Sequence, residues 1–365
     1  MILIVGGGIA GLTIGWRLAR AGEAVTVLER DSIGQAASRA AAGILFPEPE
    51  RTAMGELTAV SHTLWPSFVE ELEEITGLNL DYRRDGDIYV TFGEDEARLQ
   101  AKYHKYQTLG WLPQWLTGDE VRQWEPALSP DIAVGLYTPM THQVDNRLVV
   151  QAVAQALVKA GGMVREQTAV AQFLTSSGKI QGVRLQNGDE LYADTVILAA
   201  GSWSGQLAGL PAECVPPVRP VKGQILAVQT THPLISRMIR RRDGSLVPRR
   251  DGRLLIGVTM EEAGFDPSVT AQAVAQLLQS AERTLPGILQ NPLVETVVGF
   301  RPGTPDDQPI LGQTAVDGLL LATGQYMDGI LLAPIMAQAL AQLVQTGTTP
   351  ANIAPFNLDR FQEKS

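Results

Sequence analysis

The sequence contains very little cysteine and histidine. Among its 365 residues there is 1 cysteine, Cys214, and there are 4 histidines, at positions 62, 104, 142 and 232. A single cysteine cannot form an internal disulfide, and the histidines show none of the spacings at which zinc ligands recur. We therefore expect neither a disulfide-stabilised fold nor a bound metal.

An excess of positive charge is also lacking. The chain has 29 Lys and Arg against 39 Asp and Glu, which gives a formal net charge of −10. Proteins dedicated to nucleic acids normally present a basic surface. The charge balance therefore argues against a nucleic-acid partner, and it says little about which small molecule is bound.

Long uninterrupted hydrophobic runs are scarce. Residues 1–16 carry no charged side chain, but three consecutive glycines at 6–8 would weaken a membrane helix, and no basic segment precedes them. The run from Gly329 to Val344 contains Pro334 and two glutamines. We interpret the first run as part of the fold and the second as a buried amphipathic helix, and we expect a cytoplasmic protein without membrane contact.

The apolar segments that are present alternate between strand and helix patterns. Two short apolar runs, Met1 to Val5 and Ala24 to Leu28, flank a helical pattern and predict a βαβ unit. Apolar runs at 195–199 and 319–323 are typical of strands buried on both faces, and 148–160 has a helical pattern. These segments predict an α/β fold, with a Rossmann-like domain into which an α+β domain is inserted.

The inserted domain is expected to contain a mixed or antiparallel sheet. Its segments predict helices at 94–109 and 271–285 and strands at 88–92, 224–229, 254–258 and 293–299, and residues 56–76 of the first domain also have a helical pattern. Thr117 and Glu120 form a capping-box pattern at the start of a short helix. We assign residues 1–80, 146–215 and 302–365 to the Rossmann-like domain and residues 81–145 and 216–301 to the inserted domain.

The first glycine-rich turn carries a dinucleotide-binding motif. Gly6, Gly8 and Gly11 satisfy G-x-G-x-x-G between a strand and a helix, and Glu29 ends the next strand. The glycines allow a tight turn, a close approach to a pyrophosphate, and close packing of helix on strand. Glu29 would accept hydrogen bonds from ribose hydroxyls and repel a 2′-phosphate, so the neighbouring Arg30 is a weaker indication of NADP.

The motif alone leaves NAD and FAD as alternatives. The later strands end at Ala200-Gly201 and Thr323-Gly324, where small residues could meet the same elongated ligand. A helix beginning at Gly329 would direct its positive N-terminal end at that ligand, which favours the reduced form of a flavin. An NAD enzyme has no evident need for such a helix.

Seven segments together resemble a known family. They are residues 1–30, SRAAAGIL at 38–45, VILAAGSWSG at 196–205, RPVKGQ at 219–224, LVPRRDGRLLIGVTME at 246–261, FRPGTPD at 300–306 and TGQYMDGILLAP at 323–334. In this order they resemble the D-amino-acid oxidase superfamily of FAD-dependent oxidoreductases, and within it most closely the glycine oxidases of thiamine biosynthesis. The resemblance covers essentially the whole chain and implies a FAD-binding domain of the glutathione-reductase type.

The resemblance also implies which residues line the cofactor. The residues expected at the ADP half of FAD are Gly6, Gly8, Ile9, Ala10, Gly11, Glu29 and Arg30, with Val170 near the adenine. Those expected along the flavin and its wall are Ser38, Ala41, Ala42, Gly43, Ile44, Ala200, Gly201, Trp203, Met327, Asp328, Gly329, Ile330 and Leu331. Cys214 does not match the cysteine that tethers the flavin in related sarcosine oxidases, so a noncovalent FAD is expected.

Arg301, in FRPGTPD, matches the arginine that binds the substrate carboxylate in the glycine oxidases. A guanidinium can hold a carboxylate through two parallel hydrogen bonds, which fixes orientation as well as charge. Met260 is also expected at the substrate. Ser245 and Met327 stand where glycine oxidases usually have tyrosine and arginine, and Gln325 stands where they have histidine. These departures predict a roomier, less polar pocket that suits D-amino acids with side chains or N-alkylated glycines.

Seven arginines follow Ile235 within a short stretch: Arg237, Arg240, Arg241, Arg242, Arg249, Arg250 and Arg253. One interpretation is a solvated hairpin around Asp243-Gly244. The alternatives are that the arginines attract an anionic substrate, or that they contact an acidic surface of a neighbouring subunit.

The sequence therefore predicts FAD-dependent oxidative deamination of glycine or another small amino acid or amine, such as a D-amino acid or sarcosine. Hydride transfer from Cα to flavin N5 would give a 2-oxo acid and ammonia, with oxygen reduced to hydrogen peroxide, in a pathway that the resemblance places in thiamine (thiazole) biosynthesis. The alternatives are a dehydrogenase that passes electrons to a quinone or carrier, and a noncatalytic flavin-binding protein. The expected partners are the substrate and oxygen, and a homo-oligomer is compatible with the sequence.

Overall fold

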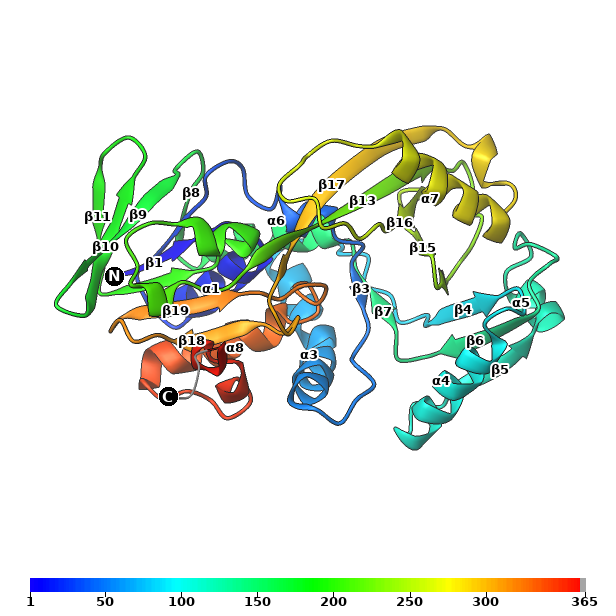
Figure 1. Ribbon diagram of the computed structural model, residues 1–365, viewed down its shortest axis with the longest axis horizontal. Helices are drawn as coiled ribbons and strands as arrows, with labels where there is room; N and C mark the ends of the chain where they lie inside the picture. Colours follow the sequence, from blue (N-terminus) through cyan, green and yellow to red (C-terminus); the bar gives the residue numbers. More distant parts are fainter. Residues whose placement is uncertain (362–365) are drawn as a thin grey trace.

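A six-stranded sheet, with strands from both ends and the middle of the chain, lies at the left of Figure 1. The computed structural model describes residues 1–361. In spatial order the strands are β18 (Ile310–Gln313), β19 (Leu319–Thr323), β12 (Thr195–Leu198), β1 (Ile2–Val5), β2 (Val25–Leu28) and β8 (Met163–Arg165). All neighbouring pairs are parallel except β18 with β19, so the carboxyl ends of β1, β2, β12 and β19 lie along one edge.

The central strand β1 shows why this sheet is covered on both faces. Ile2 and Ile4 pack with the helices on one face, whereas Leu3 and Val5 pack on the other face. Alternate side chains of a strand point to opposite faces, and here both sets are apolar. The helices on the first face are α1 (Ile9–Arg20), α3 (Ala53–Thr76), α6 (Asn146–Lys159) and α8 (Ala333–Thr346).

A three-stranded antiparallel sheet covers the opposite face. It consists of β9 (Val170–Ser176), β10 (Lys179–Leu185) and β11 (Glu190–Tyr192), seen at the left of Figure 1. Phe173, Ile180 and Val183 of this sheet join the apolar cluster of Leu3 and Val5. Helices, a mainly parallel sheet and a small antiparallel sheet thus form three layers, as the predicted Rossmann-like domain requires.

The second sheet has eight strands and lies at the right of Figure 1. In spatial order they are β17 (Leu293–Gly303), β13 (Arg219–Gln229), β16 (Arg253–Gly257), β15 (Gly244–Pro248), β14 (Met238–Arg241), β4 (Asp87–Thr91), β6 (Val134–Thr138) and β5 (Gln114–Thr117). Only β14 and β4 pair in parallel, so the predicted mixed sheet is confirmed. Its helices are α4 (Glu96–Thr108), α5 (Gly118–Trp124) and α7 (Ala271–Thr284).

The two faces of this sheet have different neighbours. Leu226, Leu246 and Ile256 pack beneath α7. Ile225 and Val247 project from the opposite face of the sheet and pack against Ala42 and Ile44, which follow α2. The face opposite α7 is therefore the one that meets the dinucleotide-binding part of the molecule.

Several short elements complete the fold. They are α2 (Ala37–Ala40), the antiparallel pair β3 (Ile44–Leu45) and β7 (His142–Gln143), and the 3-10 turns η1 (Gly201–Gln206), η2 (Ala212–Cys214), η3 (Ile288–Gln290), η4 (Ala354–Phe356) and η5 (Leu358–Phe361). The capping box at Thr117 and Glu120 is confirmed at the start of α5. The last four residues of the predicted range 302–365 lie outside the described part of the chain.

Three expectations about elements need correction. The last helix begins at Ala333 instead of Gly329, because residues 328–332 form a turn in which the Leu332 N–H donates to the Asp328 carbonyl. Strands β13 and β17 extend to Arg219 and Gly303, since each hydrogen-bonds the other along its length.

None of the helices in residues 1–361 combines the length and the apolar character needed to cross a membrane.

Candidate functional site

The turn between β1 and α1 can be built only with glycine at two positions. Gly6 has φ of +116°, and a methyl group there would collide with the Ala199 carbonyl oxygen on the neighbouring strand. A methyl group at Gly11 would collide with the carbonyl of Gly6. The first glycine thus permits the turn and the third permits the helix to pack against it, as the motif predicts.

Helix α1 has no negative side chain of its own at its N-terminus. Its N-cap is Gly8, which offers no capping side chain, and the first turn contains no acidic residue. The Ile9 N–H donates to the Ser38 hydroxyl at 3.0 Å. Unshielded N–H groups at a helix start favour a phosphate group, so this end of α1 fits the pyrophosphate of a dinucleotide.

Glu29 is held in place at the carboxyl end of β2. Its Oε2 accepts from the Gly7 N–H at 2.7 Å and its Oε1 accepts from the Asp31 N–H at 2.9 Å. Each carboxylate oxygen can accept a further hydrogen bond, so the anchored group can still receive ribose hydroxyls. Val170 is buried in the same apolar cluster as Leu28, and its place near the adenine stays a prediction.

Arg30 and Trp203 meet beside Glu29. The Arg30 guanidinium lies over the Trp203 ring at 4.7 Å, and the ring stacks on Phe265 with centroids 4.9 Å apart. Arg30 is therefore engaged with an aromatic face as well as with Asp31, and it does not act as an isolated positive charge for a 2′-phosphate. Phe265, which the sequence analysis missed, joins the eight-stranded sheet system to this wall.

Two buried side chains, Asn146 and Arg249, donate hydrogen bonds to the backbone of residues 38–44. The Asn146 Nδ2 donates to the Ser38 carbonyl at 2.6 Å, and Arg249 Nη2 donates to the Ala42 carbonyl at 2.7 Å. Arg249 is only 5% exposed, and burial lowers its pKa to about 10. At Gly43, a methyl group would collide with the Val144 carbonyl. The backbone path of the predicted flavin-lining segment is therefore fixed by its neighbours.

Hydrogen bonds also connect the two later strand ends. The Ser204 hydroxyl donates to Thr323 Oγ1 at 2.8 Å, and the Thr323 hydroxyl donates to the Gly201 carbonyl at 3.0 Å. The Leu331 carbonyl accepts from Ser61 Oγ and from Trp65 Nε1 of α3. These bonds position the segments that contain Ala200, Gly201, Gly329, Ile330 and Leu331 along the same edge of the sheet.

Asp328 has an unusual carboxyl group. Burial, together with a smaller contribution from the Glu48 carboxylate, raises its pKa to about 7. Burial also raises the pKa of Glu48, with a contribution from Glu50. The family resemblance predicts Asp328 beside the cofactor, but nothing in the sequence indicates a carboxyl group that is close to half-protonated at neutral pH.

Arg301 lies on β17, and its guanidinium packs against the backbone of Gly223, which has no side chain. A methyl group at Gly223 of β13 would lie 2.5 Å from its Nη1. Nη1 makes two long contacts, to the Lys222 carbonyl at 3.5 Å and to the Thr259 carbonyl at 3.4 Å. Partial burial lowers the pKa of Arg301, and the Tyr326 hydroxyl partly offsets this effect. A half-buried guanidinium that forms no ion pair with a carboxylate of residues 1–361 is suited to an anionic ligand.

Met260, Tyr326 and Met327 lie close to this arginine. The Tyr326 hydroxyl donates to Met260 Sδ at 3.1 Å, and the Tyr326 N–H donates to the carbonyl of Pro302, which follows Arg301. Met260 and Met327 are 56% and 60% exposed. Tyr326, missed in the sequence analysis, has φ of +45°, and that unusual backbone conformation turns the chain between the buried Gln325 and Met327.

Ser245 is placed apart from these residues. It lies on β15, which is three strands from β17, and pairs with Gly257 in register. Alternation with Leu246, which packs beneath α7, directs Ser245 to the same face of the sheet as Arg301. No hydrogen bond within residues 1–361 joins the two side chains, so a role for Ser245 in substrate binding stays a prediction.

The expected hairpin around Asp243-Gly244 is present between β14 and β15, but most of its arginines are not free in solvent. Most of its arginines form ion pairs inside the chain: Arg237 with Glu125, Arg240 with Asp87, Arg241 with Asp243, Arg242 with Asp95, Arg250 with Asp81, and Arg253 with Asp145. Arg249 is buried beneath Ala42. Apart from Asp243, the partners lie outside the hairpin: before β4 (Asp81), on β4 (Asp87), and at the ends of α4, α5 and α6 (Asp95, Glu125 and Asp145). The cluster therefore connects the hairpin to other parts of the fold.

The sequence is similar to that of characterised enzymes along its whole length. It is 37% identical to the bifunctional protein ThiO/ThiG of Synechocystis sp., over 99% of this chain and 54% of the relative. It is 35% identical to the glycine oxidase of Geobacillus kaustophilus, over 98% of this chain and 96% of the relative. The chain thus spans about half the length of the bifunctional relatives and nearly all of the glycine oxidase.

The fold agrees with these similarities. The crystal structure of glycine oxidase from Geobacillus kaustophilus superposes with a TM-score of 0.91, at 34% sequence identity, over 98% of both chains. The family described as FAD dependent oxidoreductase (DAO) matches residues 1–343. The glycine turn, the anion-binding start of α1 and the anchored Glu29 fit the ADP half of FAD. This chain belongs to the DAO family of FAD-dependent oxidoreductases.

Proposed function

We propose that this chain catalyses the FAD-dependent oxidative deamination of a small amino acid or amine. The observation that carries the proposal is Arg301, a half-buried guanidinium that forms no ion pair with a carboxylate within residues 1–361. The family supplies the redox cofactor, and Arg301 supplies a place for a carboxylate. The similarity to glycine oxidases supports glycine and related amino acids as the substrate class.

The residues of the chain are proposed to bind and orient both molecules. Gly6, Gly8 and Glu29 would hold the ADP half of a noncovalent FAD, and Cys214 is fully buried in the core, away from a tethering role. When bound, FAD supplies the two-electron acceptor for oxidation at Cα of the substrate and passes the electrons to oxygen. Arg301 would fix the carboxylate through a two-pronged contact, so that the substrate has one orientation.

The surroundings of Arg301 also bear on the protonation of the substrate. Met260 and Met327 are apolar, and Tyr326 has its pKa raised by burial. None of these side chains is a base at neutral pH. We infer that the substrate amine loses its proton to water before oxidation, and that these residues contribute orientation. The 2-oxo acid and ammonia then form by hydrolysis of the imino product in water.

The substrate range is proposed to extend beyond glycine. Met327 replaces a guanidinium and Ser245 replaces a large aromatic ring of the glycine oxidases, which leaves one arginine for one carboxylate. D-amino acids with small side chains and N-alkylated glycines such as sarcosine are therefore candidates. The similarity to ThiO/ThiG proteins supports a role in thiamine biosynthesis. Cytoplasmic location and a homo-oligomeric state remain predictions.

The test begins with a visible spectrum of the purified protein. Absorbance near about 450 nm identifies a bound flavin, whereas a colourless protein with bound nicotinamide would contradict the cofactor assignment. A panel of glycine, sarcosine and D-amino acids is then assayed for hydrogen peroxide. Bleaching by an amino acid without peroxide under air would identify a dehydrogenase. The absence of bleaching by any amino acid would identify a noncatalytic flavin protein.

A further inference from the structure

Two glycines face each other between β13 and β17. Gly223 and Gly299 are direct partners in the antiparallel register. Neither has a φ angle in the left-handed region, so the backbone conformation does not require glycine at either position. Glycine weakens the interior of a strand, and it is retained there where another group approaches the backbone closely.

The approaching group differs for the two glycines. A methyl group at Gly223 would lie 2.5 Å from Nη1, 2.7 Å from Nη2 and 2.9 Å from Cζ of Arg301. The Nη1–Nη2 edge of the guanidinium therefore lies against the backbone of Gly223. A methyl group at Gly299 would collide with Cβ of Ala40, the last residue of α2.

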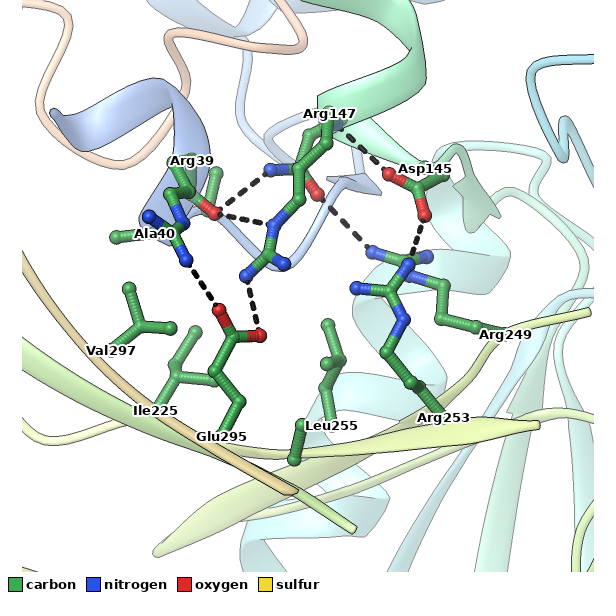
Figure 2. A pocket seen from close by; sticks show the side chains of 13 residues that line it. Arg39, Ala40, Asp145, Arg147, Ile225, Arg249, Arg253, Leu255, Glu295 and Val297 are labelled. Atoms are coloured by element: carbon green, nitrogen blue, oxygen red, sulfur yellow. Dashed lines mark hydrogen bonds and ion pairs between the residues drawn. The ribbon is translucent and has the colours of Figure 1, made fainter. Parts of the chain in front are cut away.

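Both groups lie on one face of the sheet. Residues directly opposite one another on antiparallel strands project to the same side. Ile225 and Val297, each two residues farther along its strand, line the cavity with Ala40 that Figure 2 shows. The guanidinium of Arg301 and helix α2 thus pack side by side against the paired glycines, Arg301 against Gly223 and α2 against Gly299.

We propose that Gly223 and Gly299 are positioning residues for the reaction: Gly223 sets the place of the Arg301 guanidinium, and Gly299 sets the place of α2 and the flavin-lining segment that follows it. This inference rests on the proposed function. Packing must locate the guanidinium, because its two hydrogen bonds to protein are as long as 3.4 and 3.5 Å. A methyl group at Gly223 would displace the Arg301 guanidinium and leave α2 in place, and a methyl group at Gly299 would do the reverse.

The first experiment is the Gly223→Ala variant with FAD bound. The guanidinium must move by roughly 1 Å, and a displacement of that size can cost about a hundredfold in rate when it misplaces a substrate. We expect kcat/KM for the best amino acid to fall by roughly tenfold to a hundredfold, mostly through KM. The dissociation constant of acetate, measured from its perturbation of the flavin spectrum, should rise by a similar factor. FAD affinity should stay within about twofold.

The second experiment is the Gly299→Ala variant, which should show the converse pattern. Displacement of Ala40 moves α2 and the start of residues 38–44. FAD affinity should fall by roughly tenfold, the effect of about 1.4 kcal/mol. With saturating FAD, acetate binding should stay within about twofold of the wild type, because Arg301 keeps its place on Gly223.

Two controls separate positioning from general damage. Gly287 has an ordinary φ and open space at the position of a methyl group, so Gly287→Ala should leave both affinities unchanged. The double variant Gly223→Ala with Arg301→Ala tests whether Gly223 acts through Arg301. Against the Arg301→Ala background, adding Gly223→Ala should change acetate binding by less than about twofold.

Several outcomes would overturn the inference. Unchanged acetate binding in Gly223→Ala contradicts the role of Gly223, and equal losses of FAD and acetate affinity in both variants indicate a structural role only. If wild-type protein oxidises no amino acid but binds acetate, the proposed function fails while the role of Gly223 is still measured. If it binds neither amino acid nor acetate, both proposals fail.

Discussion

At the scale of single residues, Arg301 has the clearest expected phenotype. Arg301→Lys keeps the charge but loses the planar fork, so one of two charge-assisted hydrogen bonds to a carboxylate is lost. Such a bond contributes roughly 1.5 to 3 kcal/mol, and KM should rise roughly tenfold to a hundredfold. Steady-state kinetics measures this change, and the flavin spectrum should show that FAD stays bound.

The matched control for Arg301 is Arg242→Lys. Arg242 is on the exposed hairpin, where its side chain is 68% exposed and pairs with Asp95 at 3.5 Å. An exposed ion pair contributes little, so this variant should keep the wild-type KM. A wild-type KM for Arg301→Lys itself would refute the assigned role in carboxylate binding.

Asp328 should make the stability of the protein depend on pH. Its folded-state pKa is raised from 3.8 to about 7, mainly by burial. Between these two values the unfolded state has lost its proton and the folded state has kept it, so the free energy of unfolding falls as pH rises. Below pH 3.8 Asp328 is protonated in both states, so it no longer makes the free energy of unfolding depend on pH.

The Asp328→Asn variant tests this pH dependence. The amide does not titrate, so the melting temperature of the variant should decrease less than that of the wild type between pH 5 and pH 7. Glu48→Gln removes the neighbouring carboxylate and should shift the transition of Asp328 to lower pH. Identical melting profiles for wild type and Asp328→Asn would show that Asp328 titrates near its ordinary pKa.

At the scale of elements, Arg249 supports the flavin-lining segment from outside the site. It donates to the Ala42 carbonyl at 2.7 Å, and removing a partner from a buried carbonyl costs roughly 1 to 3 kcal/mol. Arg249→Met keeps much of the buried volume and loses the donor. We expect FAD affinity, measured by titration of the apoprotein, to fall by roughly tenfold.

Arg250→Met is the control for this variant. Arg250 is the next residue, but its side chain is 56% exposed and pairs with Asp81. FAD affinity should therefore stay at the wild-type level, within about twofold. A loss in Arg250→Met equal to that in Arg249→Met would indicate a general effect of the hairpin and not support of Ala42.

The fold shows which elements a single sequence predicts well. Helices α1, α3, α6 and α7 and strands β1, β2 and β12 have regular apolar periodicity or an apolar run, and each was predicted close to its observed bounds. Strand β18 was not predicted, because its four residues have no distinctive pattern and it forms by pairing with β19. The start of α8 was misplaced because a turn stabilised by Asp328 precedes it.

The candidate site shows the same division. Gly6, Gly8, Gly11 and Glu29 are close together in sequence and form a local motif. Gly223 and Arg249 were missed, because their importance depends on which residue of a distant strand or segment lies opposite them. Gly223 is glycine because Arg301 lies on it, and only the register of β13 with β17 shows this.

At the scale of the whole molecule, the chain combines a net charge of −10 with a dense arginine hairpin. Six of the seven arginines are ion-paired with carboxylates of the same chain. Their fields are largely cancelled at short range. An amino-acid substrate also carries no net charge near neutral pH, so neither partner provides the long-range attraction that electrostatic steering requires.

We therefore expect kcat/KM to depend little on ionic strength. Raising the salt concentration from about 0.1 M to about 1 M shortens the Debye length from about 10 Å to about 3 Å, which would abolish steering. The expected change is less than about twofold. A fall of about tenfold would show that the hairpin attracts substrate after all. Chloride also competes for Arg301, and salts of different anions compared at equal ionic strength separate the two effects, because screening depends on ionic strength alone.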